Sequence, residues 1–425
     1  MQPESSLQAW LARLELQHPK SIDLGLERSR EVLTRLAIRL TCPIILVGGT
    51  NGKGSTCAYL EAILLAAGYR TGLYTSPHLL NYNERVRING KDSDDDAIVT
   101  ALAAVETVKG PTSLTYFEHG TLAAAWQFAK ENVEVAIFEV GLGGRLDAVN
   151  LFEPDVSIVT SVDLDHQDWL GADREAIGYE KAGIFRSGKP AICADPLPPQ
   201  SLINHAFDVG ADLQRINIDF SFEQHDQNWI FVWRGQAWPD LPRPVMAGDH
   251  QVRNAAAALA GLMNLQDRLS VEKEAIDQGL RSARAAGRFQ KVAEKPEVIL
   301  DVGHNPEAAR ALADNLAMYP VSGRTLAVFA LLADKDLEGV ALPLQNLIDE
   351  WHVCGLEGPR SRPVENLAAD LETILNKGLV RCHPSPEEGY EAAAIAASEN
   401  DRILVFGSFH TVASVMAAHP TWQFR

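Results

Sequence analysis

A glycine-rich loop between an apolar segment and a helix-forming segment narrows the folds open to this chain. The loop runs Gly49-Thr50-Asn51-Gly52-Lys53-Gly54-Ser55. Residues 43–47 before it are an apolar run typical of a buried parallel strand, and residues 55–65 after it are rich in helix formers. Glycine lets backbone N–H groups converge on an anion, a helix start adds its positive dipole end, and lysine supplies a mobile cation. The three parts together predict an ATP- or GTP-binding site.

The loop departs from the common phosphate-loop pattern GxxxxGK[ST] at both ends. Val47 stands where that pattern has its first glycine, and Gly54 stands where it has serine or threonine, so that Ser55 is displaced by one position. A turn without a ligand is the alternative, but the flanking strand and helix favour nucleotide binding. The displaced serine indicates a particular subclass of these loops.

Length, charge and cysteine spacing exclude several classes of protein. A chain of 425 residues exceeds one ordinary core and predicts two or three domains. A net charge of −18 disfavours non-specific nucleic-acid binding, which depends on Lys and Arg. No apolar stretch reaches the roughly 18 residues that span a bilayer, and the N-terminus lacks the regions of a signal peptide. Five scattered cysteines without CxxC spacing predict reduced thiols. We therefore expect a cytoplasmic protein that binds neither nucleic acid nor membrane.

The first two thirds of the chain alternate between apolar segments and helical stretches. The predicted strands are 44–47, 133–140, 155–161 and 190–194. Such alternation predicts an α/β fold with a mostly parallel sheet and helices on both of its faces. Residues 213–245 differ, because short apolar segments joined by polar turns predict a small antiparallel sheet. The acidic residues 92–96 are interpreted as a solvated loop.

A second, more regular α/β pattern begins near Pro296. Its predicted strands are 298–302, 326–331, 351–355, 380–383 and 403–406. The spacing predicts an independent α/β domain of about 130 residues. We place the domain boundary between a first domain at residues 1–287, which holds the glycine-rich loop, and a smaller α/β domain at residues 288–425.

Charged residues follow two predicted strands of the first domain. Glu139 closes one strand before a glycine-rich turn that holds Arg145, while Asp163, Asp165 and His166 follow the next strand. Ligands of parallel sheets bind beyond the carboxyl ends of the strands, where a carboxylate is well placed to hold Mg²⁺. The imidazole of His166 is a softer ligand than the oxygen donors that Mg²⁺ prefers. Residue type alone therefore favours a structural role for His166 over metal binding. Arg145 could reach a transferring phosphoryl group or belong to a plain turn.

Thr115 and Glu118 have the spacing of a helix capping box. The Thr-x-x-Glu pattern precedes an apolar helical stretch, and on spacing alone we favour capping over ligand binding.

Two turns of the second domain share one layout. Asn305 and Pro306 suit the N-cap and first position of a helix, which leaves Asp301 and His304 without a structural role. Residues 407–411 follow the last predicted strand in the same way. We hypothesise that the two turns face one cleft.

Eleven segments form an ordered set along almost the whole chain. They are IDLGLER (22–28), GTNGKGS (49–55), SPHL (76–79), LTYFEHGTL (114–122), EVGLGGRLDAVN (139–150), LDHQDWLG (164–171), EKAGIFR (180–186), GRFQ (287–290), DVGHNPEAA (301–309), LEGPR (356–360) and GSFHTVA (407–413). The set resembles the bifunctional dihydrofolate synthase/folylpolyglutamate synthase family, ATP-dependent amide ligases related to the Mur ligases. Each segment alone is weak evidence for this family, but eleven of them in the same order along the chain are specific to it.

The resemblance implies ATP-dependent ligation of L-glutamate to dihydropteroate, and then to the γ-carboxylate of reduced folates. ATP phosphorylates the acceptor's carboxylate, and the amino group of glutamate attacks the acyl phosphate. The implied fold is an N-terminal P-loop ATPase domain followed by a C-terminal Rossmann-like domain, and the implied cofactors are ATP and Mg²⁺, as one or two ions. We expect a monomer, since no sequence feature demands a larger assembly. A Mur-type ligase of peptidoglycan precursors and a nucleotide-binding module without turnover stay open as alternatives.

The resemblance also implies roles for individual residues. ATP contacts fall on Thr50, Asn51, Gly52, Lys53, Gly54, Ser55, Asn254, Arg288 and Asp301, and magnesium ligands on Ser76, Glu139 and His166. The dihydropteroate pocket falls on Asp23, Leu24, Gly25, Leu26, Thr115, Tyr116, Phe117, Glu118, Leu146, Asp147 and Ala148. Catalytic roles fall on Lys53, Lys181, His304 and Ser408. Lys181 matches a lysine that family members carry as a carbamate, although its helix position alone predicts a solvated side chain.

Overall fold

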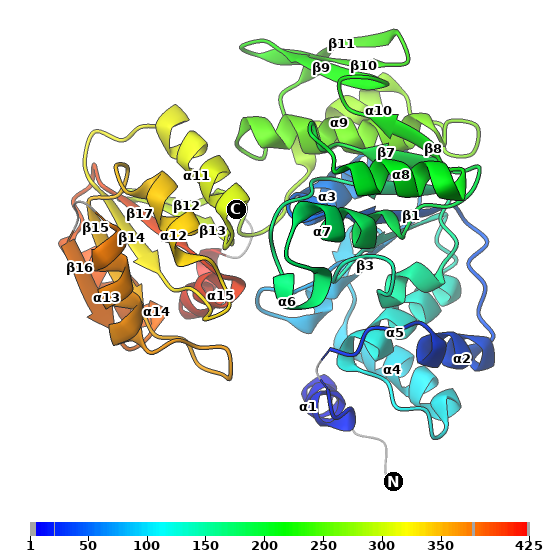
Figure 1. Cartoon of the computed structure of the whole chain (residues 1–425), viewed down its shortest axis with the longest axis horizontal. Coiled ribbons are helices and arrows are strands. Elements are labelled where there is room, and N and C mark those ends of the chain that lie inside the picture. Colours follow the sequence, from blue (N-terminus) through cyan, green and yellow to red (C-terminus); the bar gives the residue numbers. More distant parts are fainter. Residues whose placement is uncertain (1–5, 21, 376–378, 423–425) are drawn as a thin grey trace. The chain divides into compact units, whose positions relative to one another are not determined.

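The computed structural model describes residues 6–20, 22–375 and 379–422, which form two compact units (Figure 1). The first unit comprises residues 1–245 and 251–284, and the second comprises residues 246–250 and 285–425. The domain boundary expected at residues 287 and 288 stays a prediction.

The first unit is built on an eight-stranded sheet. Its order is β4 (Lys91–Asp92), β3 (Val86–Ile88), β2 (Thr71–Tyr74), β5 (Val135–Glu139), β1 (Ile44–Gly48), β6 (Val156–Val159), β7 (Pro190–Cys193) and β8 (Asp212–Arg215). The neighbouring strands β2, β5, β1, β6, β7 and β8 are parallel. At the edge of the sheet, β3 pairs antiparallel with both β2 and β4. Because β1 lies between β5 and β6, the segments that follow these three strands emerge side by side.

Helices cover this sheet, and apolar side chains fill the space between the layers. The helices are α1 (Leu7–Gln17), α2 (Glu27–Leu36), α3 (Lys53–Ala66), α4 (Asp95–Lys109), α5 (Tyr116–Glu131), α6 (Gln167–Leu170), α7 (Arg174–Ala182), α8 (Gln200–Val209), α9 (Asp249–Met263) and α10 (Lys273–Ser282), with 3-10 turns η1 (Tyr82–Arg85) and η2 (Ala148–Leu151). Strand β1 is buried along its whole length, as its apolar sequence predicts. The main core packs Leu46, Phe128 and Phe138 among their neighbours.

The acidic segment 92–96 corrects a prediction. Asp92 ends strand β4, and Asp94–Asp96 start helix α4 instead of forming a loop. Asp94 is the N-cap and accepts a 2.8 Å hydrogen bond from the backbone N–H of Ala97. Asp95 and Asp96 occupy the first turn, where negative charge stabilises the helix dipole.

A small antiparallel sheet confirms the prediction for residues 213–245. Its strands are β9 (Phe220–Gln224), β10 (Asn228–Trp233) and β11 (Gln236–Pro242), in the order β11-β10-β9. Strand β11 escaped the sequence prediction because it contains Pro239 and is mostly polar, as suits an edge strand.

The second unit is an open α/β sheet with five parallel strands and one antiparallel edge strand. Its order is β12 (Gln290–Glu294), β13 (Glu297–Asp301), β17 (Arg402–Phe406), β14 (Thr325–Phe329), β15 (Glu350–Cys354) and β16 (Leu379–His383). The helices are α11 (Pro306–Met318), α12 (Leu337–Ala341), α13 (Val364–Ile374), α14 (Pro386–Ala396) and α15 (Phe409–Ala418), with 3-10 turns η3 (Leu342–Leu344) and η4 (Pro420–Trp422). All five predicted strands are confirmed. Phe329, Trp351 and Phe406 pack together in the core, with the Phe329 and Phe406 ring centroids 4.9 Å apart.

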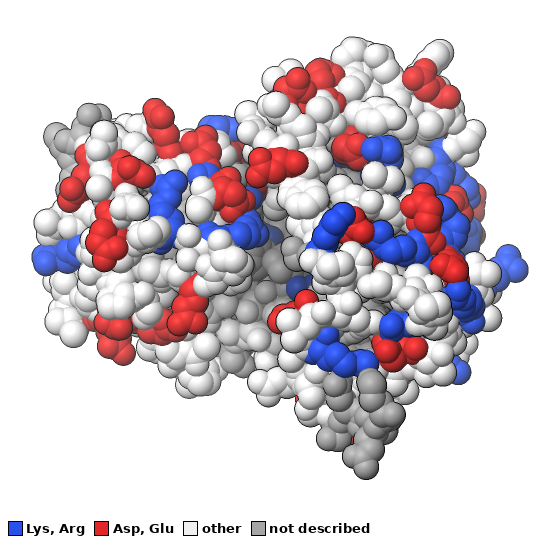
Figure 2. All heavy atoms as spheres, turned by 60° about the horizontal axis from the view of Figure 1, so that its bottom comes forward, with Lys and Arg blue, Asp and Glu red and all other residues white. Residues whose placement is uncertain are grey.

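Figure 2 shows how charged side chains are distributed on one face of the molecule. On the face in Figure 2, acidic and basic side chains are interspersed. Within the described residues, no helix is long and apolar enough to cross a membrane. The five cysteines are free thiols.

Candidate active site

The glycine-rich loop joins the end of β1 to the start of α3, as predicted. Gly49 and Gly52 have φ values of 142° and 85°, which side-chain-bearing residues rarely adopt. A Cβ atom at Gly49 would lie 1.9 Å from the Oγ1 of Thr160. Ser55 is buried in the first turn of α3. The backbone path of the loop therefore requires glycine at Gly49 on steric grounds.

Hydrogen bonds fix the loop to the segment that follows β6. The Thr50 N–H donates to the Ser161 carbonyl at 2.8 Å, and the Asn51 N–H donates to the Ser161 hydroxyl at 3.1 Å. The Asp163 N–H donates to the Thr50 hydroxyl at 3.0 Å. The Lys53 ammonium donates to the carbonyls of Gly49 and Thr50, at 3.0 and 3.1 Å, so it is held over its own loop.

Asn254, the nucleotide contact predicted from α9, lies against this loop. Its side chain is buried, and its Oδ1 would be only 2.4 Å from a Cβ atom at Gly52. Its amide nitrogen donates to the Oε1 of Gln251 at 3.2 Å. Asn254 therefore shares a site with the loop although about 200 residues separate them in sequence.

Glu139 and Ser76, two predicted magnesium ligands, lie next to each other. Glu139 is buried at the end of β5 and pairs in register with Val47 of β1, just before the loop. Its Oε2 accepts a 3.1 Å hydrogen bond from the Ser76 N–H. The third predicted ligand, His166, is the N-cap of α6 with a φ of 52°. The described residues contain no cluster of three His, Cys, Asp or Glu side chains suited to a metal.

The donor set nevertheless fits a hard divalent cation. A buried carboxylate and a serine hydroxyl are oxygen donors of the kind Mg²⁺ prefers, and phosphate oxygens of a nucleotide usually complete its octahedron. The position of Glu139 beside the phosphate loop suits that arrangement.

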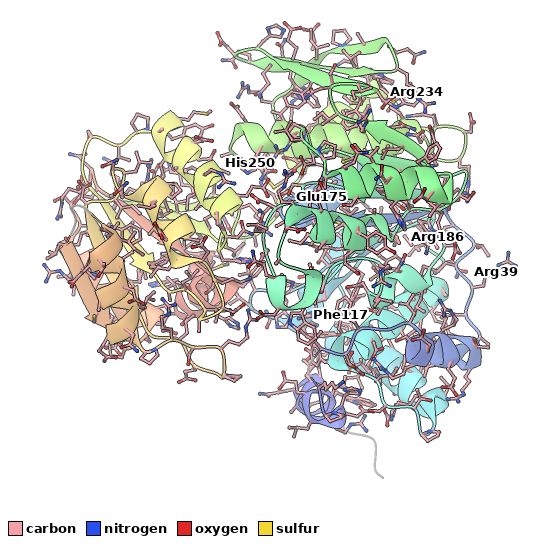
Figure 3. All side chains as sticks on the ribbon, in the orientation of Figure 1. Arg39, Phe117, Glu175, Arg186, Arg234 and His250 are labelled. Carbon is pink, nitrogen blue, oxygen red and sulfur yellow. The ribbon has the colours of Figure 1, made fainter. Side chains whose placement is uncertain are left out.

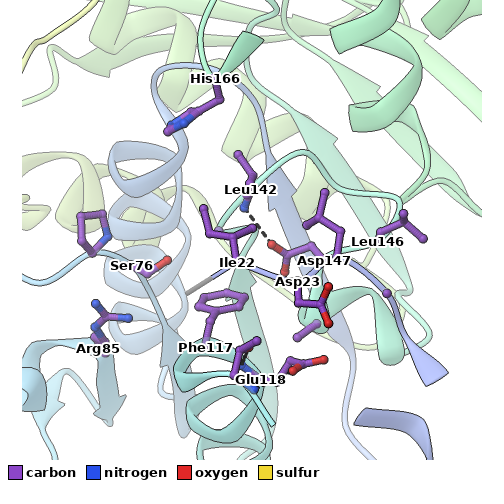
Figure 4. A pocket seen from close by; sticks show the side chains of 16 residues that line it. Ile22, Asp23, Ser76, Arg85, Phe117, Glu118, Leu142, Leu146, Asp147 and His166 are labelled. Carbon is purple, nitrogen blue, oxygen red and sulfur yellow. Dashed lines mark hydrogen bonds between the residues drawn. The ribbon is translucent and has the colours of Figure 1, made fainter. Parts of the chain in front are cut away.

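A cavity of about 260 Å³ brings most of the predicted pocket residues together with Ser76 and His166, two of the three predicted metal ligands, while Glu139 is not among its lining residues (Figure 4). Its lining consists of Ile22, Asp23, Leu24, Gly25, Ser76, Pro77, Arg85, Thr115, Phe117, Glu118, Gly141, Leu142, Leu146, Asp147, Ala148 and His166. Phe117, labelled in Figure 3, lines this cavity from the first turn of α5. Two predicted pocket residues, Leu26 and Tyr116, are not among the lining residues. Leu26 is the N-cap of α2, and Tyr116 packs edge-on against Tyr82 at 5.8 Å.

Sequence analysis missed five lining residues. Ile22, Pro77, Gly141 and Leu142 lie inside segments that carried the resemblance, within three residues of a predicted site residue. Arg85 lies outside those segments, and its place in the pocket depends on tertiary structure.

Glu118 forms hydrogen bonds both within α5 and with residues of α2, two parts of the chain next to the cavity. The predicted capping box is confirmed, because Glu118 Oε2 accepts from the Thr115 N–H at 2.8 Å and the Thr115 hydroxyl accepts from the Glu118 N–H. Glu118 Oε1 also accepts from Arg28, at 3.1 Å, and from the Ser29 hydroxyl, at 2.9 Å. Arg28 in turn donates to Asp23 at 2.6 Å. This network holds residues 22–25 against α5.

Asp147 is a buried carboxyl on another wall. Its oxygens accept from the backbone N–H groups of Leu142, at 2.8 Å, and Val149, at 3.0 Å. Burial raises the pKa of Asp147 to about 6, although these hydrogen bonds oppose the shift. Its charge therefore changes close to physiological pH.

Lys181 and Arg145, two basic residues of the first unit, both have structural surroundings that their sequence positions did not predict. Lys181 is buried, with 4% of its surface exposed, in the last turn of α7. The interpretation as a solvated lysine, based on helix position alone, was wrong. Arg145 forms a 2.7 Å ion pair with Glu180, and its guanidinium lies over the ring of Tyr179. These contacts give Arg145 a structural role, which supports its interpretation as part of a plain turn.

The second unit gathers its own predicted residues at the ends of β13 and β17, which are neighbours. The Arg288 guanidinium lies 5.6 Å from the Phe409 ring centroid, and the His304 ring lies 6.4 Å from it. Ser408 is the N-cap of α15, and its hydroxyl accepts from the Thr411 N–H at 3.0 Å. The two turns therefore lie together in this unit.

Asp301 has a structural role that sequence analysis missed. Its carboxylate accepts from the N–H groups of Phe289, at 2.9 Å, and Gly303, at 2.8 Å. Burial raises its pKa, while the nearby Arg288 opposes the rise. That the residues of both units serve one reaction stays a prediction.

Two family models match the chain where these features lie. The Mur ligase middle domain matches residues 47–262, and the glutamate ligase domain of the Mur ligases matches residues 287–409. The chain belongs to the Mur ligase family. Within that family it is 46% identical to the dihydrofolate synthase/folylpolyglutamate synthase of Escherichia coli K12, over 98% of this chain and 96% of the relative. The same enzyme of Haemophilus influenzae is 40% identical, over 97% of each chain.

Solved structures of Mur ligases agree in fold. The E. coli enzyme in complex with DHPP and ADP has a TM-score of 0.93 at 45% identity, covering 98% of both chains. A bifunctional folylpolyglutamate synthase/dihydrofolate synthase with Mn, AMPPNP and L-glutamate bound has a TM-score of 0.91 at 46% identity, covering 98% of this chain and 99% of that one.

The comparisons confirm the family, the α/β fold class and the enzyme class expected from the sequence. This Mur ligase is an ATP-dependent glutamate ligase of folate metabolism, with dihydrofolate synthase/folylpolyglutamate synthase activity. The relatives found do not support the alternative of a peptidoglycan precursor ligase.

Proposed function

We propose that the 260 Å³ cavity of the first unit holds dihydropteroate or a reduced folate, with its carboxylate directed toward ATP on the glycine-rich loop. The observation that supports this most is the set of residues that line the cavity. The residues expected to contact the pteroate share the cavity with Ser76 and His166, which are expected to hold the metal. An acceptor bound there would reach the phosphate end of the nucleotide.

The chemistry requires activation of a carboxylate, which is a poor acyl donor. A carboxylate oxygen attacks the γ-phosphorus of ATP, ADP leaves, and an acyl phosphate forms. The amino nitrogen of L-glutamate then attacks the acyl carbon, the carbon–oxygen bond breaks, inorganic phosphate leaves, and the nitrogen loses a proton. Enclosure of the acyl phosphate in an apolar cavity limits its hydrolysis.

The chain's own residues supply charge and orientation for these steps. Lys53 neutralises the outer phosphates, and Asn254 contacts the nucleotide beside Gly52. Ser76, Glu139 and His166 would hold Mg²⁺, which would neutralise phosphate charge when bound. Burial of Lys181 disfavours its ammonium and favours the neutral amine, which is the form that reacts with CO₂ to give the proposed carbamate. The carbamate would bring negative charge toward a cation.

Replacing Glu118 by glutamine separates its capping role from its role in the cavity wall. Glutamine keeps one acceptor oxygen but loses the ion pair with Arg28, so we expect unfolding free energy to fall by about 1–3 kcal/mol. Loosening of residues 22–25 should also weaken dihydropteroate binding. Titration calorimetry and thermal unfolding measure the two effects. Glu131→Gln, at the exposed end of the same helix, is the matched control, and unchanged dihydropteroate affinity in Glu118→Gln would leave capping as its only role.

Dihydropteroate binding should depend on the ionisation of Asp147. The ionised carboxylate accepts hydrogen bonds from pteridine N–H groups, and protonation removes part of that capacity. Because the pKa in the free enzyme is about 6, affinity should be full above pH 7 and should fall as the pH decreases through 6. The limiting slope is about tenfold per pH unit for one proton. Asp147→Asn should remove this dependence between pH 5 and 7. An affinity that rises as the pH falls in the wild type would contradict this role.

The activity itself is tested with purified full-length protein. Given ATP, Mg²⁺, L-glutamate and dihydropteroate, the protein should release ADP only when dihydropteroate is present. Folded protein that shows no such release would contradict the proposal. A nucleotide-linked sugar peptide offered as the acceptor tests the Mur-type alternative. Nucleotide binding without ADP release with either acceptor would indicate a module without turnover.

The monomeric state and the cytoplasmic location are kept as proposals. They rest on the sequence features given above, and a monomer's mass in light scattering would support the first of them.

A further inference from the structure

Arg85 lies at the end of the cavity that contains Ser76. The Arg85 carbonyl accepts a 2.9 Å hydrogen bond from the N–H of Thr75, the residue before Ser76. In the hairpin that joins β2 to β3, Tyr74 pairs with Val86. Backbone pairing therefore holds Arg85 beside the Ser76-Pro77 turn, and all three residues line the cavity.

The segment that carries Arg85 is fixed by a single, partly buried carboxylate. Glu84 accepts hydrogen bonds from the backbone N–H groups of Leu79, Leu80 and Asn81, at 2.7, 2.8 and 2.7 Å. The last of these closes the capping box of η1. The position of the Arg85 backbone is therefore determined without any ligand.

The guanidinium of Arg85 is also held in place. Its Nε donates to Nδ1 of His78 at 2.8 Å, and its Cζ lies 5.4 Å from the ring centroids of both Tyr82 and Tyr116. These contacts use one N–H and the π faces of two rings. Tyr74 also contacts this guanidinium through a side-chain hydrogen bond. An arginine has five N–H donors, so enough of them remain for a bidentate carboxylate partner.

Arg85 differs from Arg28 and Arg87, two partly buried arginines of this unit, in having no carboxylate partner. Arg28 pairs with Asp23 and Glu118, and Arg87 pairs with Glu61 and Asp92. For Arg85, no ion pair with any carboxylate of the described chain is found. A half-buried, oriented guanidinium in a cavity without a protein carboxylate is suited to a ligand carboxylate.

The opposite side of the cavity has the opposite charge. In Figure 4, Ser76 and Arg85 lie on one side of the Phe117 ring, and Asp23 and Asp147 lie on the other. A pteroate carries N–H donors at its pteridine end and a carboxylate at its benzoate end. Only one orientation places the donors near the acids and the carboxylate near the arginine.

We propose that Arg85 binds the benzoate carboxylate of the acceptor and so orients the group that is phosphorylated. This inference rests on the proposed function of the cavity, and it makes Arg85 a specificity-determining residue. The fork holds both carboxylate oxygens beside Ser76, and a remaining lone pair on one of them attacks ATP.

The test compares dihydropteroate with its carboxamide analogue, which keeps the shape but loses the charge. Dissociation constants are measured by titration calorimetry for wild type, Arg85→Gln and Arg85→Lys. Wild type should bind the acid about 10- to 100-fold more tightly than the amide, as expected for a charge-assisted bidentate pair. Arg85→Gln should lose that preference while binding the amide normally, and Arg85→Lys should recover part of it. KM for ATP should change by less than about twofold, since Arg85 does not contact the loop.

The controls separate the possible failures. Arg70→Gln removes an exposed arginine, paired with Glu134, and should keep the preference for the acid. Thermal unfolding checks that Arg85→Gln is folded. If wild type prefers the acid and Arg85→Gln keeps that preference, or loses acid and amide binding equally, the role of Arg85 is wrong although the proposed function stands. If wild type binds neither ligand, the proposed function of the cavity fails and the inference fails with it.

Discussion

Replacing Lys53 by alanine is expected to slow turnover by about 100- to 1,000-fold, the usual effect of removing one preorganised stabiliser of transition-state charge. Among the described residues, the Lys53 ammonium donates hydrogen bonds to the carbonyls of Gly49 and Thr50 alone, both in its own loop, so we expect its removal to cost the fold little. Its loss should therefore reduce kcat while the thermal midpoint stays within a few degrees.

The measurement is ADP release at saturating ATP and dihydropteroate. Lys91→Ala, a change of the same kind at an exposed position, is the control and should keep the wild-type rate. A near-normal rate in Lys53→Ala would mean that the phosphate loop has been misidentified.

Replacing Gly49 by alanine is expected to disrupt the loop itself. The new Cβ would lie 1.9 Å from the Thr160 hydroxyl and 3.1 Å from the Ser161 nitrogen, at a φ of 142° that is strained for alanine. Overpacking and backbone strain each cost about 1–3 kcal/mol, so unfolding free energy should fall by about 2–6 kcal/mol. Displacement of the loop should also abolish measurable ATP binding.

Gly68→Ala separates the two causes. Gly68 has a φ of 91°, but a Cβ atom there would meet nothing within 4 Å. That variant should lose only about 1 kcal/mol, from backbone strain alone, and should bind ATP normally. Equal losses in the two variants would show that the contact with Thr160 is unimportant.

The features predicted well from sequence are those that neighbouring residues determine. The phosphate loop, the capping box of Thr115 and Glu118 and the core strands have local signals, namely glycines, cap spacing and apolar runs. The acidic residues Asp94 to Asp96 were misjudged because a charge run suits a solvated loop as well as a helix start.

The features that were missed depend on distant parts of the chain. The burial of Lys181, the raised pKa of Asp147 and the structural bonds of Asp301 all arise from tertiary packing. Arg85 enters the cavity because a hairpin returns it to Ser76, nine residues earlier in sequence. Periodicity and motif spacing carry no signal for that placement.

The central claim, that the acceptor's carboxylate is activated by phosphorylation before glutamate attacks, is tested most directly by isotope transfer. Dihydropteroate labelled with ¹⁸O in its carboxylate is turned over with ATP, Mg²⁺ and L-glutamate, and the released inorganic phosphate is analysed by mass spectrometry. One ¹⁸O atom should appear in each phosphate released with dihydrofolate. Unlabelled phosphate accompanying the formation of dihydrofolate would contradict the account.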